Sequence, residues 1–290
     1  MENIVTVQCV YGDNHRQHIL SNLLPSLQFA TTSSVHLYLM NYDPNSTRLI
    51  GDESIRNVLV TEIANEGRVH TGFAENHNAI FRSSDPRKYF IIINPDCIAT
   101  PGCIDRLIQR KESEREEVGI VEGRQWPFEH PKEYDPDTLE TPWASGAFCL
   151  IDSKFYRNIG GMDERYRLYL EDVDLSWQAW VNGYRVIYEP ESVVIHFTGF
   201  PFYRSDIRYY EHYLPLRNFI YISRKFLGDD GEDEAIAYLR EAIGQKHTRE
   251  IIKSYQNMAC MSDRRELQEL AIRHRMIKIL GLNVFHEVHK

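Results

Sequence analysis

Apolar, β-rich runs alternate with helical patterns along the first part of the chain, and this alternation restricts the possible folds more than any other feature. Ile4–Val10 is rich in β-branched residues and is followed by the turn-like YGDN; Arg16–Leu27 then has apolar residues at helical spacing. Further strands are expected at Val35–Asn41 and Tyr89–Ile93, with a helix over Asn76–Arg82 between them. Strands that are apolar along their length and joined through helices predict a mostly parallel sheet with helices on both faces.

Polar residues follow the expected strands. They are YGDN after the first strand, NYD after the second and NPD after Tyr89–Ile93, and Thr100 with Pro101 then predicts the start of another helix. Ligands of open parallel sheets bind beyond the carboxyl ends of the strands, so we expect a ligand site there. The chain has neither GxGxxG nor GxxxxGK[ST], so a nicotinamide fingerprint and a P-loop do not account for these residues.

The overall composition narrows the class of protein. A chain of 290 residues with 42% hydrophobic residues can form one large core, or one domain with a smaller appended part. From about residue 226 the pattern becomes helical, so we expect a first domain over residues 1–225 and a C-terminal helical region over 226–290. The formal charge of −9 argues against a nucleic-acid partner held by general electrostatics.

Cysteine usage and the apolar runs bear on location. Five cysteines without a CxxC pair indicate neither a disulfide framework nor a cysteine-based zinc site, which fits a reducing cytoplasm. No apolar run approaches the roughly 18 residues that a membrane span needs, and the N-terminus lacks the pattern of a signal peptide. We therefore expect a cytoplasmic protein that is soluble or attached peripherally to a membrane.

Asp96 and His196 both stand at expected strand ends. Asp96 follows Tyr89–Ile93 within NPD, where it either forms an Asx-type turn or holds a hard divalent cation against a diphosphate. His196 ends the β-branched run ESVVIH, where a hydrogen-bonded structural histidine is the commoner case. If both residues face one edge of the sheet, their oxygen and imidazole donors would suit manganese better than calcium.

Three carboxylates, Glu171, Asp172 and Asp174, stand at the start of a helical pattern in LYLEDVDLSW. Acidic residues in a first helical turn complement the positive end of the helix dipole, which accounts for all three without a catalytic role. The alternative is that one of them is a general base. The choice between these interpretations depends on the surrounding sequence.

The motifs between residues 141 and 196 follow one another in a fixed order: SGAF, IGGMDERY, YLEDVDLSW, NGYRV and VVIH. In this order the chain resembles the family 2 glycosyltransferases, which are inverting enzymes of GT-A fold, and within them the rhamnosyltransferase-like branch of cell-surface polysaccharide assembly. Upstream, GFAENHN is similar to the donor-binding segment of the family and NPD to its DxD metal motif. The resemblance covers roughly residues 3–225.

The resemblance implies a GT-A fold and a single displacement, in which an acceptor hydroxyl attacks the anomeric carbon of a nucleotide-activated sugar. It makes Asp172 the general base, and Glu171 and Asp174 supporting acids. Asp96 and His196 would hold Mn²⁺ or Mg²⁺ against the leaving diphosphate. Asn94 stands where the first acid of DxD is usual, a replacement that this branch commonly tolerates.

The donor contacts implied by the resemblance involve Asn41 or Asp43 for the nucleoside, and Asn78 and Asp96 for the rest of the nucleotide sugar. Gly146 would either let the substrates approach the backbone closely or form a tight turn before a strand. Asn76 stands where the family usually has glycine, and NYDPNS is a loose version of the usual nucleoside turn. Trp143, just before SGAF, either supports a sugar ring or belongs to the core.

The implied donor is dTDP-rhamnose or a UDP-sugar, and the implied acceptor is a hydroxyl of a glycan or of a polyprenyl-diphosphate-linked saccharide. The aromatic-rich segment 199–226 would close over the donor, contact a lipid-linked acceptor at the inner face of the membrane, or, over Phe219–Phe226, pack on the sheet as an amphipathic helix. The C-terminal helices are a candidate contact for a homodimer.

Two other functions are compatible with a sheet that carries carboxylates at its strand ends. A nucleotidyltransferase would need a glycine-rich, basic loop after the first strand, and VYGDNHRQ is not one. A catalytically silent module that binds a nucleotide sugar or a glycan would not require Asp96, Asp172 and His196 together, and all three are present.

Overall fold

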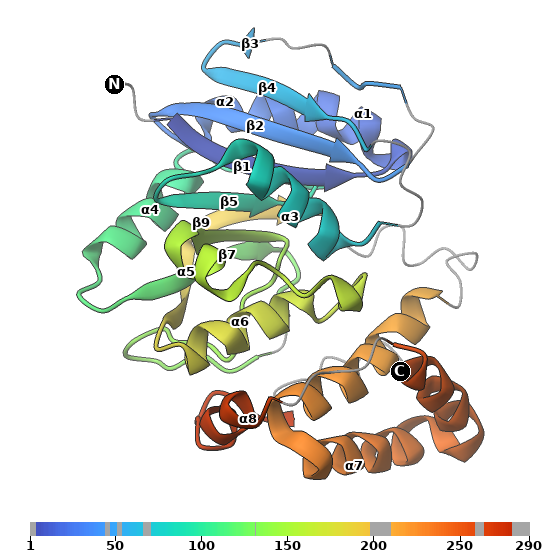
Figure 1. The fold of residues 1–290 in the computed structure, drawn as a ribbon. Coiled ribbons are helices and arrows are strands. Elements are labelled where there is room, and N and C mark those ends of the chain that lie inside the picture. The colour runs from blue at the N-terminus through green and yellow to red at the C-terminus, as the bar shows by residue number, and fades with distance from the viewer. Residues whose placement is uncertain are drawn as a thin grey trace.

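The computed structural model describes residues 4–43, 47–50, 54–65, 71–130, 132–197, 210–258 and 264–279, which form a single sheet covered by helices (Figure 1). The sheet has nine strands in the order β3-β4-β2-β1-β5-β8-β7-β9-β6. The strands are β1 (Ile4–Tyr11), β2 (Ser34–Asn41), β3 (Ser54–Ile55), β4 (Val58–Ile63), β5 (Tyr89–Ile93), β6 (Cys97–Ala99), β7 (Val118–Trp126), β8 (Phe148–Asp152) and β9 (Arg185–His196).

The parallel arrangement predicted from the sequence occupies one half of the sheet. β4, β2, β1 and β5 are consecutive neighbours and all run parallel. In the other half β8 runs antiparallel to both β5 and β7, whereas β7 and β9 are parallel. The described part of the connection 127–147 contains no helix, so the chain leaves β7 and returns beside it in the opposite direction.

Helices cover both faces of the sheet. On one face lie α2 and α4, and on the other lie α3, α5, α6, α7 and α8. Side chains of β5 alternate between the two cores, with Phe90 and Ile92 in one and Ile91 and Ile93 in the other, as expected for a strand that is buried on both sides. The helices are α1 (Arg16–His18), α2 (Leu24–Ala30), α3 (Phe73–Ser84), α4 (Cys103–Ser113), α5 (Ser153–Ile159), α6 (Glu171–Val181), α7 (Tyr210–Gln256) and α8 (Arg265–Ile272).

The helix after NPD begins later than the sequence suggested. Residues 97–99 form the short strand β6, which pairs with β9, and α4 starts at Cys103. The hydroxyl of Thr100 donates to the carbonyl oxygen of Val193 at 2.7 Å instead of capping the helix. The residue before α4 is Gly102, which has a φ of 75°, a conformation that glycine adopts without steric cost.

The C-terminal helices pack against the sheet domain through α6 (Figure 1). Phe226 of α7 meets Trp177 of α6 edge to face, with 5.2 Å between ring centroids. α7 runs across the boundary expected at residue 225, and the interruption nearest to it is Gly228, with a φ of 72°. The domain boundary therefore stays a prediction. Phe219 and Phe226 are buried, as expected of an amphipathic helix, but Phe226 packs on α6 and not on the sheet itself. Residues 198–209 lie outside the described part.

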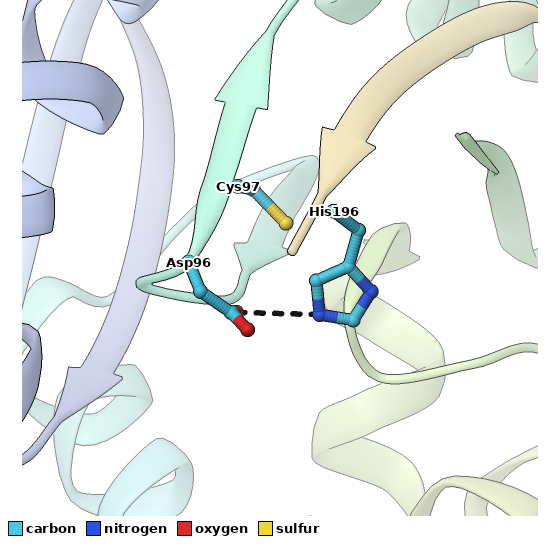
Figure 2. Close-up of side chains that lie close together, drawn as sticks. All are labelled: Asp96, Cys97 and His196. Atoms are coloured by element: carbon cyan, nitrogen blue, oxygen red, sulfur yellow. Dashed lines mark ion pairs between the residues drawn. The ribbon is translucent and has the colours of Figure 1, made fainter. Parts of the chain in front are cut away.

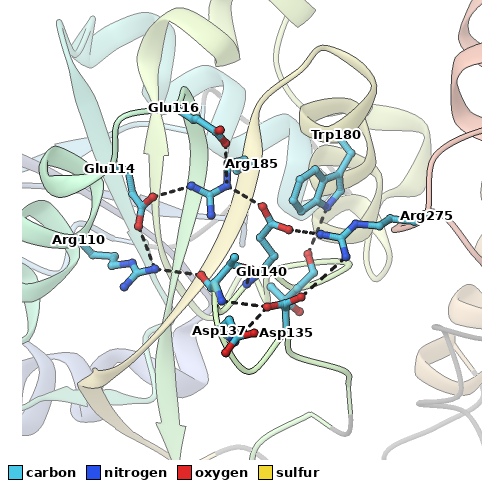
Figure 3. A network of polar contacts seen from close by, with 11 residues as sticks. Arg110, Glu114, Glu116, Asp135, Asp137, Glu140, Trp180, Arg185 and Arg275 are labelled. Carbon is cyan, nitrogen blue, oxygen red and sulfur yellow. Dashed lines mark hydrogen bonds and ion pairs between the residues drawn. The ribbon is translucent and has the colours of Figure 1, made fainter.

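A polar network also holds the chain beyond α8 to the sheet domain (Figure 3). The guanidinium of Arg185, on β9, lies 2.7 Å from Glu140 and 2.5 Å from Glu114. Arg275, which follows α8, pairs with Glu140 from the other side and lies 3.8 Å from Asp135. Arg185 and Glu140 are largely buried, whereas the side chain of Arg275, which joins the C-terminal segment to them, is 66% exposed.

Among the described residues, no helix combines the length and the apolar character that crossing a bilayer requires.

Candidate active site

Asp172 lies in the first turn of α6 with its carboxylate fixed by backbone groups. Oδ2 accepts a hydrogen bond of 3.0 Å from the N–H of Gly146, and Oδ1 accepts one of 2.8 Å from the N–H of Val173. Burial raises the pKa of Asp172, although both hydrogen bonds act in the opposite direction. A half-buried carboxylate with a raised pKa and a fixed direction is suited to accept a proton.

The two neighbouring acids differ from Asp172 in their surroundings. Burial, followed by the charge of Asp172, raises the pKa of Glu171 well above its ordinary value, so a charged Asp172 disfavours the charged form of Glu171. Asp174 is buried, accepts a 2.7 Å hydrogen bond from the hydroxyl of Tyr166 and forms an ion pair with Lys225 of α7. Asp174 therefore serves to attach α7 to α6.

The segment before Asp172 has an unusual backbone. Arg167, Tyr169 and Leu170 have φ values of 65°, 71° and 68°, which non-glycine residues seldom adopt. The side-chain amide of Asn218, on α7, donates to the carbonyl oxygens of Leu168 and Tyr169 at 2.8 Å each. Asn218 is fully buried, and these bonds stabilise the positive-φ backbone of the segment.

The second group of polar side chains lies at the end of β9 (Figure 2). Oδ1 of Asp96 lies 3.2 Å from Nε2 of His196, and Nδ1 of His196 lies 2.8 Å from Oε1 of Gln125. Since an amide oxygen only accepts, Nδ1 carries a proton; Nε2 donates to Asp96 in the doubly protonated ring and presents a lone pair in the neutral ring. The pKa of Asp96 is lowered, because the hydrogen bond and charge of His196 outweigh the effect of burial. Asn94 shares this side of the ring, with Nδ2 at 3.4 Å from Nε2.

Two consecutive residues join these groups. Gly146 donates its N–H to Asp172, and the carbonyl oxygen of Ala147 accepts a 2.8 Å hydrogen bond from the N–H of Asn94. A Cβ on Gly146 would come within 3.2 Å of the ring of Phe73 on α3, so the small residue lets α3 approach this turn closely. The SGAF turn thus lies between Asp172 and the pair of Asp96 and His196.

The residues expected to contact the nucleoside lie at the ends of β1 and β2. Asn41 donates a 2.8 Å hydrogen bond to Asp13, and the backbone N–H of Asp13 donates to Asp43 at 2.7 Å. Asn41 also accepts a 2.8 Å bond from the N–H of Asp43. The side chains form a connected polar rim, with Asn41 buried and Asp13 exposed. Pro44, Asn45 and Ser46 of the expected turn lie outside the described residues.

Asn78 does not fit the donor contact expected from the sequence. Its Nδ2 donates to the carbonyl oxygen of Met162 and to Glu164, both at 2.9 Å, and its Oδ1 accepts from the hydroxyl of Tyr156 at 2.6 Å and from the N–H of Met162 at 3.0 Å. Because these bonds occupy both hydrogens and both lone pairs, Asn78 fastens α3 to the GGMDE turn and has no group left for a donor.

Trp143 belongs to the core, and a buried ion pair that the sequence did not suggest lies beside it. Trp143 is 4% exposed, and Nζ of Lys132 lies 4.1 Å from its ring centroid. Nζ also lies 2.6 Å from Oε1 of Glu122, which accepts the N–H of Ser145 at 3.0 Å. The pair therefore supports the same turn that carries Gly146, and Lys132 acts to lower the pKa of Asp172.

Known proteins resemble this chain in sequence and in structure. No family model matches the chain. The chain is 25% identical over 142 residues, covering 37% of this chain and 46% of the relative, to N-acetylglucosaminyl-diphospho-decaprenol L-rhamnosyltransferase of Mycobacterium tuberculosis. It is 31% identical over 67 residues, covering 23% of this chain and 25% of the relative, to rhamnosyltransferase WbbL of Escherichia coli. The chain thus spans less than half the length of the curated relatives it matches.

Solved structures share the arrangement of nearly the whole chain. A mannosyltransferase of Pyrobaculum calidifontis in complex with GDP-Man and Mn²⁺ matches 97% of this chain and 86% of its own, with a TM-score of 0.57 and 13% identity. GalNAc-T7 with UDP, GalNAc and Mn²⁺ matches 99% of this chain and 56% of its own, with a TM-score of 0.55 and 14% identity. These neighbours confirm the GT-A fold, and the sequence relatives support the resemblance to the rhamnosyltransferase-like branch.

Proposed function

We propose that this chain, a rhamnosyltransferase-like glycosyltransferase of GT-A fold, transfers a sugar from a nucleoside-diphosphate donor to an acceptor hydroxyl with inversion at the anomeric carbon. The observation that carries the proposal is the SGAF turn. The N–H of Gly146 donates to the carboxylate of Asp172, and the carbonyl oxygen of Ala147 accepts from Asn94 of the NPD segment. A candidate base and a candidate cation site therefore lie on either side of one turn. That placement suits a reaction that needs a base on one side of the anomeric carbon and charge neutralisation on the other.

Asp172 takes the proton in the proposed step. The acceptor oxygen forms a bond to the anomeric carbon as its hydroxyl proton passes to Asp172, and the bond from that carbon to the diphosphate oxygen breaks on the opposite face. The electron pair of the broken bond leaves with the nucleoside diphosphate. Because burial raises the pKa of Asp172, the carboxylate is a stronger base than an exposed aspartate.

Asp96 and His196 fit a divalent cation. Their donor atoms, Oδ1 of Asp96 and Nε2 of His196, are 3.2 Å apart. In the neutral ring Nε2 presents its lone pair on the side of Asp96, and Gln125 holds the ring through Nδ1. An amide rotated by half a turn at Asn94 would add its oxygen to the same site. A bound Mn²⁺ or Mg²⁺ would neutralise the negative charge of the diphosphate.

The rim formed by Asp13, Asn41 and Asp43 is the proposed contact for the nucleoside, because it continues the same edge of the sheet. The donor is proposed to be dTDP-rhamnose or a UDP-sugar. By analogy with the mycobacterial relative, the acceptor is proposed to be a saccharide linked to a polyprenyl diphosphate, reached at the cytoplasmic face of a membrane.

Nucleotide binding with and without metal tests the proposal. The melting temperature of the purified chain is measured with UDP, dTDP or GDP, first with Mn²⁺ and then with EDTA. A matching nucleotide at about 100 times its Kd should stabilise the chain by about 2.7 kcal/mol, and only with Mn²⁺. Asp96→Ala should lose this response, whereas Asp105→Asn, a first-turn carboxylate of α4 outside the site, should keep it.

The transfer reaction itself needs a second measurement. Nucleotide release from dTDP-rhamnose and UDP-sugars is followed with a polyprenyl-diphosphate-linked N-acetylglucosamine as acceptor. Release that depends on the acceptor supports a transferase. Metal-dependent binding without release from any of these donors would indicate a binding module instead.

A further inference from the structure

Cys97 lies beside the proposed cation site, on a strand that faces His196. β6 and β9 are antiparallel, and Cys97 is the residue directly opposite His196 in their register. Directly opposed residues of an antiparallel pair project from the same face of a sheet. Figure 2 shows the thiol on the same side as the imidazole and the Asp96 carboxylate. One donor atom from each of the three residues lies within 4.8 Å of the other two.

We propose that Cys97 is a third protein ligand of the cation held by Asp96 and His196, and that the site consequently prefers zinc-like, thiophilic divalent cations to Mg²⁺. The inference rests on the proposed function for the position of the cation. It adds a ligand and a metal preference that the aspartate and histidine alone would not give.

The separations suit such an ion. Oxygen and nitrogen ligands at about 2.0–2.1 Å from a tetrahedral cation lie about 3.3 Å from each other. The observed separation of Oδ1 of Asp96 and Nε2 of His196 is 3.2 Å. A sulfur ligand at about 2.3 Å would lie less than about 4 Å from either atom, so a small movement of the Cys97 side chain completes the set. The fourth position would then go either to the amide oxygen of Asn94 or to a substrate oxygen.

The surroundings of the thiol favour a metal ligand over an exposed reactive group. Cys97 is fully buried and His196 is 5% exposed, whereas the side chain of Asp96 is 19% exposed and leaves a path to solvent. The hydrogen-bond partner of Sγ is the carbonyl oxygen of Ala147, at a long 3.9 Å. A cation that binds sulfur would displace the thiol proton, which passes to solvent, and would lose little hydrogen bonding. Soft sulfur favours Zn²⁺ and Co²⁺ over Mg²⁺ and Mn²⁺.

Absorption spectroscopy with Co²⁺ tests the proposal without any assay of transfer. The full chain is freed of metal and titrated with Co²⁺, and a thiolate-to-cobalt charge-transfer band is expected in the near-ultraviolet. Cys97→Ala should lose the band. Cys103→Ala, which removes another buried thiol from α4, should retain it. The Zn²⁺ affinity of Cys97→Ala should fall by about tenfold or more and that of Mn²⁺ should change much less.

Three results separate this inference from the proposed function. If the native chain binds Co²⁺ without the band, Cys97 is not a ligand, and the site of Asp96 and His196 still stands. A band that persists in Cys97→Ala also overturns the inference, because another thiol must then supply the sulfur. Absence of any cation binding by the native chain, measured by calorimetry with and without nucleotide, would overturn both.

Discussion

The side-chain amide of Asn218 lies 2.8 Å from the carbonyl oxygen of Tyr169, three residues before the proposed base. Tyr169 and Leu170 both have positive φ values, and the next residue begins α6. Asn218 lies on a helix about fifty residues further along the chain. Its hydrogen bonds thus stabilise the backbone that orients the side chain of Asp172.

Asn218→Ala should slow transfer through the position of Asp172. Loss of the buried hydrogen bonds to the carbonyl groups of Tyr166, Leu168 and Tyr169 is expected to cost about 1–3 kcal/mol of stability. The turnover number should fall while the nucleotide Kd stays unchanged, because Asn218 bonds to residues 166–169 and not to the rim proposed for the nucleoside. Steady-state kinetics and calorimetry measure the two quantities. Asn182→Ala, which removes an exposed side-chain bond to Gln178, is the control. Equal loss of turnover and nucleotide affinity would argue against a positioning role.

Asp172→Asn should abolish most of the transfer activity and raise stability at neutral pH. Removal of a general base typically lowers the rate by about a hundredfold to ten-thousandfold. Because burial raises the pKa of Asp172 in the folded chain, its stabilising contribution exists below the unfolded-state pKa and is lost as pH rises through the folded-state value. The melting temperature of the variant should therefore exceed that of the native chain at pH 7, and the difference should shrink towards pH 4. A fully active variant would exclude Asp172 as the base.

The same pKa shift predicts the acidic side of the rate profile. Transfer requires the charged carboxylate, so kcat/KM should fall at a pH above the range of an ordinary aspartate. Measurement between pH 4 and 8 with donor and acceptor fixed locates the midpoint. A midpoint at the ordinary value of aspartate would contradict the effect that we assign to burial.

Gln125→Ala should weaken cation binding without removing a ligand. Oε1 of Gln125 keeps the proton on Nδ1 of His196, and loss of such an outer partner typically costs about ten- to a hundredfold in metal affinity. Titration with Mn²⁺ in the presence of nucleotide, followed by electron paramagnetic resonance, measures the change. Gln178→Ala on the partly buried side of α6 serves as a control. Unchanged affinity in Gln125→Ala would show that the ring needs no such support.

Lys225→Met should destabilise the fold more than any exposed substitution. Nζ of Lys225 lies 2.9 Å from Asp163 and pairs with Asp174, and all three side chains are at least nine-tenths buried. Removal of one partner from a buried ion pair costs about 3–5 kcal/mol, because the remaining charge has no compensation. Combining it with Asp174→Asn should recover part of the loss. Denaturant unfolding measures each variant, and additive losses in the pair would contradict the coupling.

Sequence patterns predicted those parts of the site that depend on local order along the chain. Asp96 follows an apolar strand and Asp172 opens an amphipathic helix, so each position can be inferred from its neighbours. The structural contacts of Asn78 could not be inferred from the sequence, because its partners, Met162 and Tyr156, are about eighty residues away. Gln125 and Asn218 gave no signal for the same reason, since their contacts exist only after β7 meets β9 and α7 meets the segment before α6.

The attachment of α7 has a consequence for modularity. Asn218 and Lys225 lie on the helix that leads into the C-terminal region, yet they fix the approach to Asp172 and the helix that carries it. Both residues and their partners lie within residues 1–225, so an exchange at residue 225 would keep these contacts and would instead break the packing of Phe226 on Trp177. A functional chimera would have to preserve the edge-to-face contact with Trp177 of α6, because that contact helps to join the chain beyond residue 225 to the sheet domain.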